Sequence, residues 1–208
     1  MSEVITIDLM RHGVTTAGSC FLGVTDAPLT GQGWDQMQAS VIHQSYDQVV
    51  SSPLMRCAAF AKCYAREKDL PLRIERDLKE IDFGAWEGKT SAEIWETQQQ
   101  LLSAFWGDPA NNAPPGGEPY RLFQQRVGDA FKTLSVQSNA QSGGVESNSE
   151  SKCLIITHGG VIREVISSIL CLPFEKLYCI HIDYAGITRI ESRNSHLSLR
   201  FINQRIQG

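Results

Sequence analysis

Short apolar runs alternate with amphipathic stretches along most of the 208-residue chain. Residues 4–9 are β-branched and apolar in near alternation, which predicts a strand that ends just before Arg11 and His12. The continuous apolar run at 153–157 is typical of a strand buried on both faces, and His158 follows it directly. Shorter strands are predicted at 48–51 and 72–75, and a hairpin of two strands around 193–195 is predicted within 186–203.

Helical periodicity follows most of these strands. Thr30 can cap a helix whose core-facing side chains include Met37 and Val41. Residues 52–53 are Ser-Pro, which predicts an N-cap and a first-turn proline for a helix through about Ala65. Further helices are predicted at 91–106 and 120–134 and directly after His158-Gly159-Gly160, with a loop at 111–117.

Strands that alternate with helices imply an α/β fold with a mostly parallel sheet covered on both faces. We expect a single domain that spans residues 1–208, since a chain of this length can bury a full core. Residues 136–151 contain five serines, two glycines and almost nothing apolar. That composition predicts a mobile insertion within the domain.

Composition and charge exclude several classes of protein. A net charge of −4, from 19 basic and 23 acidic side chains, argues against a nucleic-acid binder, which needs a basic face. No apolar run approaches the roughly 20 residues of a membrane-spanning helix. The first ten residues lack the basic and apolar regions of a secretory signal, so we expect a cytoplasmic protein. The six cysteines form no C-x-x-C pair, which favours buried reduced thiols over zinc or disulfides.

Basic and imidazole side chains collect where the predicted strands end. Arg11 and His12 follow the first strand, Arg56 lies early in the helix after the second, and His158 follows the most apolar strand. Ligands of open α/β sheets bind at these carboxyl ends. Two guanidinium groups and helix N-termini favour an anion, most simply a phosphoryl group. A neutral histidine can attack phosphorus, and a second can stabilise charge on the oxygens.

Such a displacement also needs a proton donor for the leaving alkoxide and later a base for water. The stretch 78–88 offers Glu80, Asp82 and Glu87, and spacing alone does not choose among them. A histidine zinc site is the competing interpretation, but zinc favours closely spaced ligand pairs. No two of the five histidines, at positions 12, 43, 158, 181 and 196, lie within four residues of each other. We expect His43, His181 and His196 to be surface or core residues.

The segment Leu9-Met10-Arg11-His12-Gly13-Val14-Thr15 resembles the opening signature of the histidine phosphatase superfamily, also called phosphoglycerate mutase-like. The resemblance covers nearly the whole chain, because the later motifs of the family follow in order. They are similar to residues 23–30 (GVTDAPLT), 51–56 (SSPLMR), 80–88 (EIDFGAWEG), 115–118 (PGGE) and 157–160 (THGG).

The resemblance implies a three-layer α/β/α sandwich in which His12 is phosphorylated during turnover. Arg11, Arg56 and His158 would then form the phosphate pocket, and Glu80 would be the proton donor. Asp82 and Glu87 would have structural roles. The same match adds Thr15, Gly23 and Gly159 as phosphate- or substrate-binding positions. No metal and no other cofactor is expected, because guanidinium and imidazole groups supply the positive charge. The two arginines should also keep His12 neutral below the usual imidazole pKa of about 6.5.

Two positions depart from the pattern of the family. Members commonly have Glu or Gln where this chain has Val14, and Asn where it has Gly18. The Asn often contacts the phosphate, so one donor is missing here or is supplied by Ser19. Neither change touches the covalent chemistry, but either can alter the rate or the leaving groups that fit.

The partner is expected to be a small phosphomonoester. The chain lacks the segment that full-length cofactor-dependent mutases insert between Glu80 and His158. Hydrolysis is therefore favoured over mutase action. Within the phosphatases, the chain length, the stretch 82–88 and the closing hairpin look most like bacterial α-ribazole 5′-phosphate phosphatases of cobalamin assembly. The alternatives are a broad-specificity sugar phosphatase or phosphoglycerate mutase and, in another class, a non-catalytic phosphate-binding regulatory module. The sequence carries no signal for an oligomeric state.

Overall fold

One mixed sheet organises the computed structural model, which describes residues 4–137, 151–194 and 196–204. The strand order is β3-β2-β4-β1-β5-β6, with parallel pairing from β3 to β1 and antiparallel pairing of β1 with β5 and β5 with β6. This confirms the mostly parallel sheet and the closing hairpin. The strands are β1 (Val4–Arg11), β2 (Gln48–Ser51), β3 (Leu72–Ile74), β4 (Ser151–Thr157), β5 (Ile187–Arg193) and β6 (His196–Gln204).

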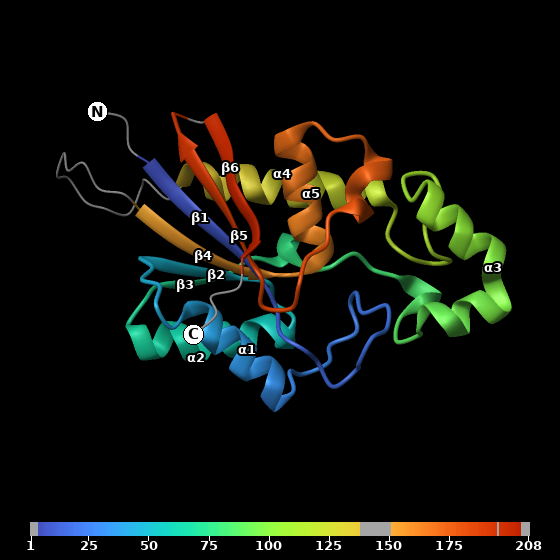
Figure 1. Cartoon of the computed structure of the whole chain (residues 1–208), viewed down its shortest axis with the longest axis horizontal. Helices are drawn as coiled ribbons and strands as arrows, with labels where there is room; N and C mark the ends of the chain where they lie inside the picture. The colour runs from blue at the N-terminus through green and yellow to red at the C-terminus, as the bar shows by residue number, and fades with distance from the viewer. Residues whose placement is uncertain (1–3, 138–150, 195, 205–208) are drawn as a thin grey trace.

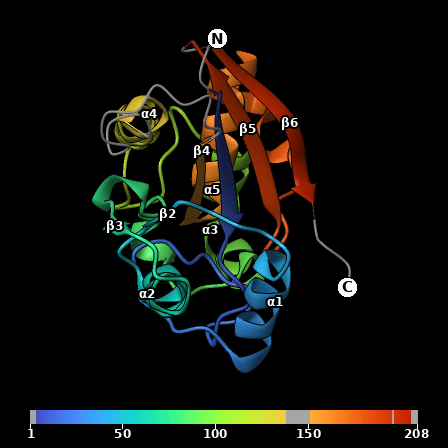
Figure 2. The same ribbon diagram turned by 90° about the vertical axis from the view of Figure 1, so that its left-hand side faces the viewer.

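Helices cover both faces of this sheet, so the expected three-layer α/β/α sandwich is confirmed. Figures 1 and 2 show α1 and α2 on one side and α4 and α5 on the other, while α3 lies beyond the carboxyl ends of the strands. The helices are α1 (Gly31–Val41), α2 (Met55–Lys68), α3 (Ser91–Gly107), α4 (Tyr120–Gln137) and α5 (Gly159–Leu170), with 3₁₀ turns η1 (Arg76–Leu78), η2 (Gly84–Trp86) and η3 (Phe174–Cys179). In the part of the chain that is described, no helix is long and apolar enough to cross a membrane.

Successive side chains of β1 point to opposite faces of the sheet and contribute to the hydrophobic core on each face. Ile7 and Leu9 pack with residues of α4 and α5, whereas Met10 packs with residues of α1 and α2. All three are fully buried, as period-two side-chain alternation requires of a central strand. A third, aromatic cluster under α3 contains Phe21 and Phe105, and it lies outside the two sheet cores.

Several sequence predictions need correction. Ser52 does not cap α2, which begins at Met55 instead; the Met55 amide donates to the Asp26 carboxylate at 2.6 Å. The helix also continues to Lys68, beyond the predicted end. Of the six free cysteines only Cys57 and Cys153 are buried, so the expectation of buried thiols is wrong for the other four.

The predicted insertion at 136–151 lies almost entirely outside the described residues. Helix α4 continues through Gln137 and β4 begins at Ser151, so the predicted segment includes residues of both elements at its ends. Residues 138–150, which carry most of its serines, are not described. The mobility of that segment stays a prediction.

Strand register places the ends of three strands at the same edge. Arg11 pairs with Thr157, and Ser51 pairs with Ile156. The next residue of each strand is therefore a polar side chain at the carboxyl edge of the sheet, and these residues are His12, His158 and Ser52. Sheet pairing thus brings together side chains that are far apart in the sequence.

Candidate active site

His12 is held at the end of β1 by main-chain contacts on both sides. Its amide donates to the Thr157 carbonyl at 3.0 Å, which continues the pairing with β4. The next residue, Gly13, packs so closely on α1 that a Cβ there would lie 2.0 Å from the Gly33 carbonyl oxygen. Only glycine fits this approach, and it fixes the direction in which the chain leaves the strand.

The hydrogen bonds of His12 define which ring nitrogen carries a proton. Nδ1 lies 2.8 Å from the Gly13 carbonyl oxygen, which can only accept, so Nδ1 is protonated. In the neutral ring Nε2 then keeps a free lone pair. Burial, followed by the charges of Arg56 and Arg11, lowers the pKa of His12 from 6.5 to about 3. The predicted direction is confirmed, although burial contributes more than the arginines.

His158 lies beside His12, with 5.3 Å between the ring centroids, and is fully buried. Arg56 Nε donates to its Nδ1 at 3.2 Å, so Nε2 carries the proton and donates to Ser52 Oγ at 2.7 Å. Burial and the Arg56 charge lower the pKa of His158 well below its ordinary value. The serine predicted to be a helix cap therefore positions this histidine instead.

Arg56 is fully buried in the first turn of α2. Besides His158, its guanidinium donates to the carbonyl oxygens of Leu22, Gly23 and Thr25 at 2.6–3.1 Å. Through Arg56, the first turn of α2 is therefore connected to the loop that precedes α1. Its charge still acts on His12, because it contributes to the lowered pKa of that ring.

Arg11 faces the other side of His12. Its guanidinium carbon lies 3.9 Å from the centroid of the Tyr184 ring, and its NH1 donates to the Ile182 carbonyl at 2.6 Å. Nε is buried and has no partner among the described residues. An unpaired buried donor is costly, which makes this nitrogen a suitable ligand for an anion. Burial lowers the pKa of Arg11, and Tyr184 and Glu80 oppose that shift.

Glu80 lines the same cavity as Arg11, and its carboxylate is held at the start of α5. Oε2 accepts from the Gly160 amide at 2.9 Å, and Oε1 accepts from the Ile81 amide at 3.1 Å. A Cβ on Gly160 would lie 2.2 Å from Glu80 Oε1, so glycine at that position leaves room for the carboxylate.

The carboxylates of the other two candidate acids, Glu87 and Asp82, accept hydrogen bonds from main-chain amides. The Glu87 carboxylate accepts from the amides of Gly23, Val24, Thr25 and Phe83 at 3.0–3.2 Å. Asp82 Oδ1 accepts from the amide of Gly84 at 2.8 Å. These contacts agree with the structural roles that the family resemblance implies for both.

A cavity of about 320 Å³ opens over His12. It contains three of the predicted site residues, Arg11, His12 and Glu80, together with Gly18, which replaces the Asn of the family, and Ser19, the residue that could supply the missing donor. The lining residues are Arg11, His12, Gly18, Ser19, Cys20, Phe21, Leu22, Glu80, Phe83, Ser91, Trp106, Arg163, Tyr178 and Tyr184.

The remaining predicted site residues surround the cavity without lining it. Arg56 and His158 lie behind His12, and Gly159 lies close to Arg11, because a Cβ there would be 3.5 Å from Arg11 Nε. Thr15 is buried, and its hydroxyl has no partner among the described residues. Gly23 donates its amide to Glu87. Direct ligand contacts of these residues stay predictions.

Several residues that line the cavity were not among the predicted site residues. Arg163 is one of them: its Nε donates to the Ile180 carbonyl at 2.8 Å, and its guanidinium carbon lies 5.7 Å from the centroid of the Tyr178 ring. It stands four residues after Gly159 and therefore on the same helical face, so helical spacing could have identified it. Trp106 and Tyr178 come from distant segments and give no comparable signal.

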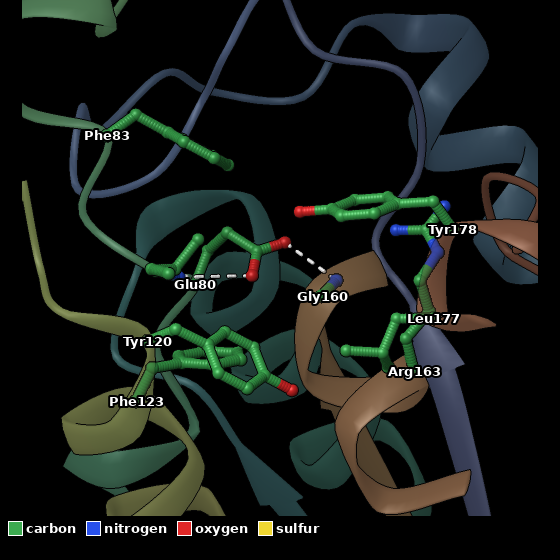
Figure 3. Close-up of a pocket in the computed structure, with 9 residues that line it drawn as sticks. Glu80, Phe83, Tyr120, Phe123, Gly160, Arg163, Leu177 and Tyr178 are labelled. Atoms are coloured by element: carbon green, nitrogen blue, oxygen red, sulfur yellow. Dashed lines mark hydrogen bonds between the residues drawn. The ribbon is translucent and has the colours of Figure 1, made fainter. Parts of the chain in front are cut away.

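Figure 3 shows a second, smaller hollow beside Glu80, with the Gly160 amide bonded to the carboxylate. Its volume is about 60 Å³, enough for a few water molecules and too little for an aromatic ring. Glu80, Phe83, Arg163 and Tyr178 line both spaces. The carboxylate therefore stands where the two compartments meet.

Comparison with known proteins agrees with this geometry. The family model of the histidine phosphatase superfamily (branch 1) matches residues 7–205. The chain is 28% identical over 205 residues to the adenosylcobalamin/alpha-ribazole phosphatase of Escherichia coli (strain K12), with 96% of each chain covered. It is 29% identical over 175 residues to the glucosyl-3-phosphoglycerate phosphatase of Mycolicibacterium vanbaalenii, which covers 80% of this chain and 75% of the relative.

The solved structures give the same relationship. The alpha-ribazole phosphatase from Shigella flexneri superposes with a TM-score of 0.81 at 27% identity, over 98% of both chains. The predicted enzyme class, a phosphatase of the histidine phosphatase superfamily, is thereby confirmed. A chain that matches over this length, with paired histidines at the ends of β1 and β4, belongs to branch 1 of the histidine phosphatase superfamily.

Proposed function

We propose that this chain hydrolyses phosphomonoesters through a phosphohistidine at His12, with α-ribazole 5′-phosphate as its substrate. The observation that carries the proposal is the state of His12. Its Nδ1–H is bound to the Gly13 carbonyl, its pKa is lowered to about 3, and its neutral Nε2 has a free lone pair at the cavity. A buried neutral imidazole of this kind is a nucleophile.

In the first step Nε2 of His12 attacks phosphorus and the bond to the ester oxygen breaks. Arg11 supplies guanidinium donors for the phosphoryl oxygens, which carry the charge of the transition state. Glu80, which is protonated when this step begins, lines the same cavity and gives its proton to the departing alkoxide. The products are the free alcohol and a phosphorylated His12.

In the second step water attacks the phosphohistidine. Glu80, now a carboxylate, takes the proton of that water, and the bond between phosphorus and Nε2 breaks. Inorganic phosphate leaves and His12 returns to its neutral form. Arg56 and His158 lie behind the nucleophile and contribute positive charge and orientation.

The substrate assignment is supported by the relatives whose names contain alpha-ribazole phosphatase, at 26–28% identity over nearly the whole chain. A sugar-type phosphomonoester is the second candidate, since a glucosyl-3-phosphoglycerate phosphatase is 29% identical over 80% of this chain. Both would share the two-step chemistry and differ in the leaving group.

Trapping the phosphoenzyme tests the mechanism. Wild-type protein mixed with ³²P-labelled substrate and quenched in base should carry acid-labile label, and His12→Ala should carry none. His43→Ala, which removes an exposed histidine, is the matched control and should label like wild type. Acid-labile label that persists in His12→Ala would refute the assignment of the nucleophile.

A substrate panel tests specificity. We expect α-ribazole 5′-phosphate to be hydrolysed with a higher kcat/KM than sugar phosphates and 3-phosphoglycerate, with phosphate released to water. Equal or lower efficiency on the first substrate would overturn the α-ribazole assignment. Transfer of phosphate back to the substrate would identify a mutase, and phosphate binding without turnover of any ester would identify a binding module.

A further inference from the structure

Four aromatic side chains that the proposed chemistry does not use line one side of the cavity. Phe21 comes from the loop before α1, Phe83 from the segment after Glu80, Trp106 from α3 and Tyr178 from η3. Ring centroids are 5.0 Å apart for Phe21 and Phe83, 5.8 Å for Phe21 and Trp106, and 4.7 Å for Trp106 and Tyr178. We call this continuous set the aromatic wall.

Two members of the wall remain open to solvent. Trp106 is 43% exposed and Tyr178 is 41% exposed, although they pack against each other at the cavity. Phe105 is 1% exposed and supports both from behind, at 5.1 and 6.0 Å. The two exposed rings are therefore held in place while part of their apolar surface stays in water. A flat apolar group laid against them would remove that surface from water.

The cavity is larger than the phosphoryl chemistry needs. At about 320 Å³ it falls within the range of sites for small organic molecules, about 300–1,000 Å³. Arg11, His12 and Glu80 line the same cavity as the wall. A leaving group whose oxygen lies at Glu80 therefore extends past Phe83 and Tyr178, because these two side chains stand beside Glu80 (Figure 3).

The charged groups near the wall are consistent with a neutral ring. Arg163 lies beside Tyr178, with its guanidinium carbon 5.7 Å from the ring centroid, and its Nε is bound to the Ile180 carbonyl. The Glu80 carboxylate accepts hydrogen bonds from the Gly160 and Ile81 amides. Recognition at the wall itself thus depends on stacking and apolar contact, which are tolerant of ring substituents.

We propose that the aromatic wall binds a flat aromatic ring carried by the leaving group, and that Trp106 and Tyr178 are specificity-determining residues for such substrates. This inference rests on the proposed function and deepens it, because it names the substrate class as aryl-bearing alkyl phosphomonoesters. It also assigns discrimination to residues that take no part in phosphoryl transfer.

A matched pair of substrates isolates the ring. α-Ribazole 5′-phosphate and ribose 5-phosphate share the same primary ester on a ribose, so the reactivity of their leaving groups is alike. They differ in the benzimidazole ring. The quantity to measure is the ratio of kcat/KM for the two substrates, which cancels changes common to both.

Trp106→Ala should lower that ratio by about 10- to 100-fold, the size of effect that loss of one stacking ring produces. Tyr178→Ala should lower it in the same direction, and Trp106→Phe should restore most of it. Trp95→Ala is the control, because Trp95 lies on the same helix, is 48% exposed and does not line the cavity. Its ratio should equal that of wild type.

Calorimetric binding of α-ribazole, the riboside without phosphate, provides a readout that is independent of turnover. Weaker binding to Trp106→Ala than to Trp95→Ala supports the wall even if the chain hydrolyses neither ester, an outcome that would remove the proposed function alone. An unchanged ratio and unchanged binding in both Trp106→Ala and Tyr178→Ala would overturn the inference. Equal loss on both substrates would overturn it too, since the wall would then act on the phosphoryl end.

Discussion

Replacing Gly160 by alanine should remove proton transfer while leaving the fold intact. A Cβ at this position would lie 2.2 Å from Glu80 Oε1 and 3.0 Å from its Cδ. Carbon and oxygen atoms in contact are normally about 3.3–3.6 Å apart, so the carboxylate must move by about 1 Å. The movement also strains its bond to the Gly160 amide, now 2.9 Å.

The expected cost follows from that displacement. A misplacement of about 1 Å at a reacting group can lower the rate by about 100-fold, or about 2.7 kcal/mol, and general acid catalysis as a whole contributes about 10²- to 10⁴-fold. Stability should change little, because the clash is with the end of a flexible side chain and alanine is favoured over glycine in a helix by about 1 kcal/mol. We therefore expect kcat on alkyl phosphomonoesters to fall about 100-fold in Gly160→Ala without a loss of thermal stability.

The assay compares two leaving groups. 4-Nitrophenolate leaves without a proton, so phosphorylation of His12 by 4-nitrophenyl phosphate should remain fast in Gly160→Ala. Attack by water still needs Glu80, and the variant should release one equivalent of nitrophenolate in a burst, followed by slow turnover. Gly128→Ala, at a helical glycine with nothing within 4 Å of its Cβ, is the control. Alkyl-ester turnover within two-fold of wild type, or equal slowing on both esters without a burst, would refute the reasoning.

Three more predictions concern His12 and Glu87. Because the pKa of His12 is lowered to about 3, protonation of the nucleophile should cause no fall in kcat/KM between pH 6.5 and 4. A fall in kcat/KM on the acid side that is centred near pH 6.5 would contradict this. The folded protein keeps His12 neutral, whereas the unfolded chain protonates it near pH 6.5. The free energy of unfolding should therefore fall as the pH drops below 6.5, by about 2 kcal/mol at pH 5. The Asn side chain does not titrate, so urea unfolding at pH 7 and pH 5 should show a loss about 2 kcal/mol smaller in His12→Asn than in wild type. Glu87→Ala leaves four main-chain amides without the carboxylate that they bind. In urea, it should lower the free energy of unfolding by about 3 kcal/mol relative to the exposed control Glu96→Ala. An equal effect of the two substitutions would refute the structural role of Glu87.

The parts of the site that depend on strand ends could be predicted from the sequence. Hydrophobic pattern identified β1 and β4, and a histidine directly follows each, so the general position of His12 and His158 followed from the rule for parallel sheets. The register that makes them neighbours, Arg11 opposite Thr157, depends on pairing between strands and is not encoded in either strand alone.

Contacts between distant segments could not be predicted. Ser52-Pro53 has the local pattern of a helix start, but Ser52 binds His158 and the helix start is bound by Asp26 from another loop. Local propensity gives way here because a buried imidazole nitrogen must have a partner, and the serine is the group in reach. The proposed choice of Glu80 over Glu87 likewise depends on tertiary structure, because Glu80 lines the cavity and Glu87 does not.

The contacts also separate chemistry from specificity. His12, Arg11 and Glu80 are fixed by main-chain groups at the carboxyl edge of the sheet: the Gly13 and Ile182 carbonyls and the Gly160 amide. The exposed part of the aromatic wall comes instead from α3 and η3, which contribute no group to the proposed phosphoryl transfer. Because the groups assigned to the reaction do not depend on α3 or η3 for their hydrogen bonds, substitutions at Trp106 or Tyr178 are expected to change which leaving group is accepted while the proposed two-step displacement at His12 is retained. Specificity in this chain is therefore open to change by a few surface residues, whereas the chemistry depends on the register of the sheet itself.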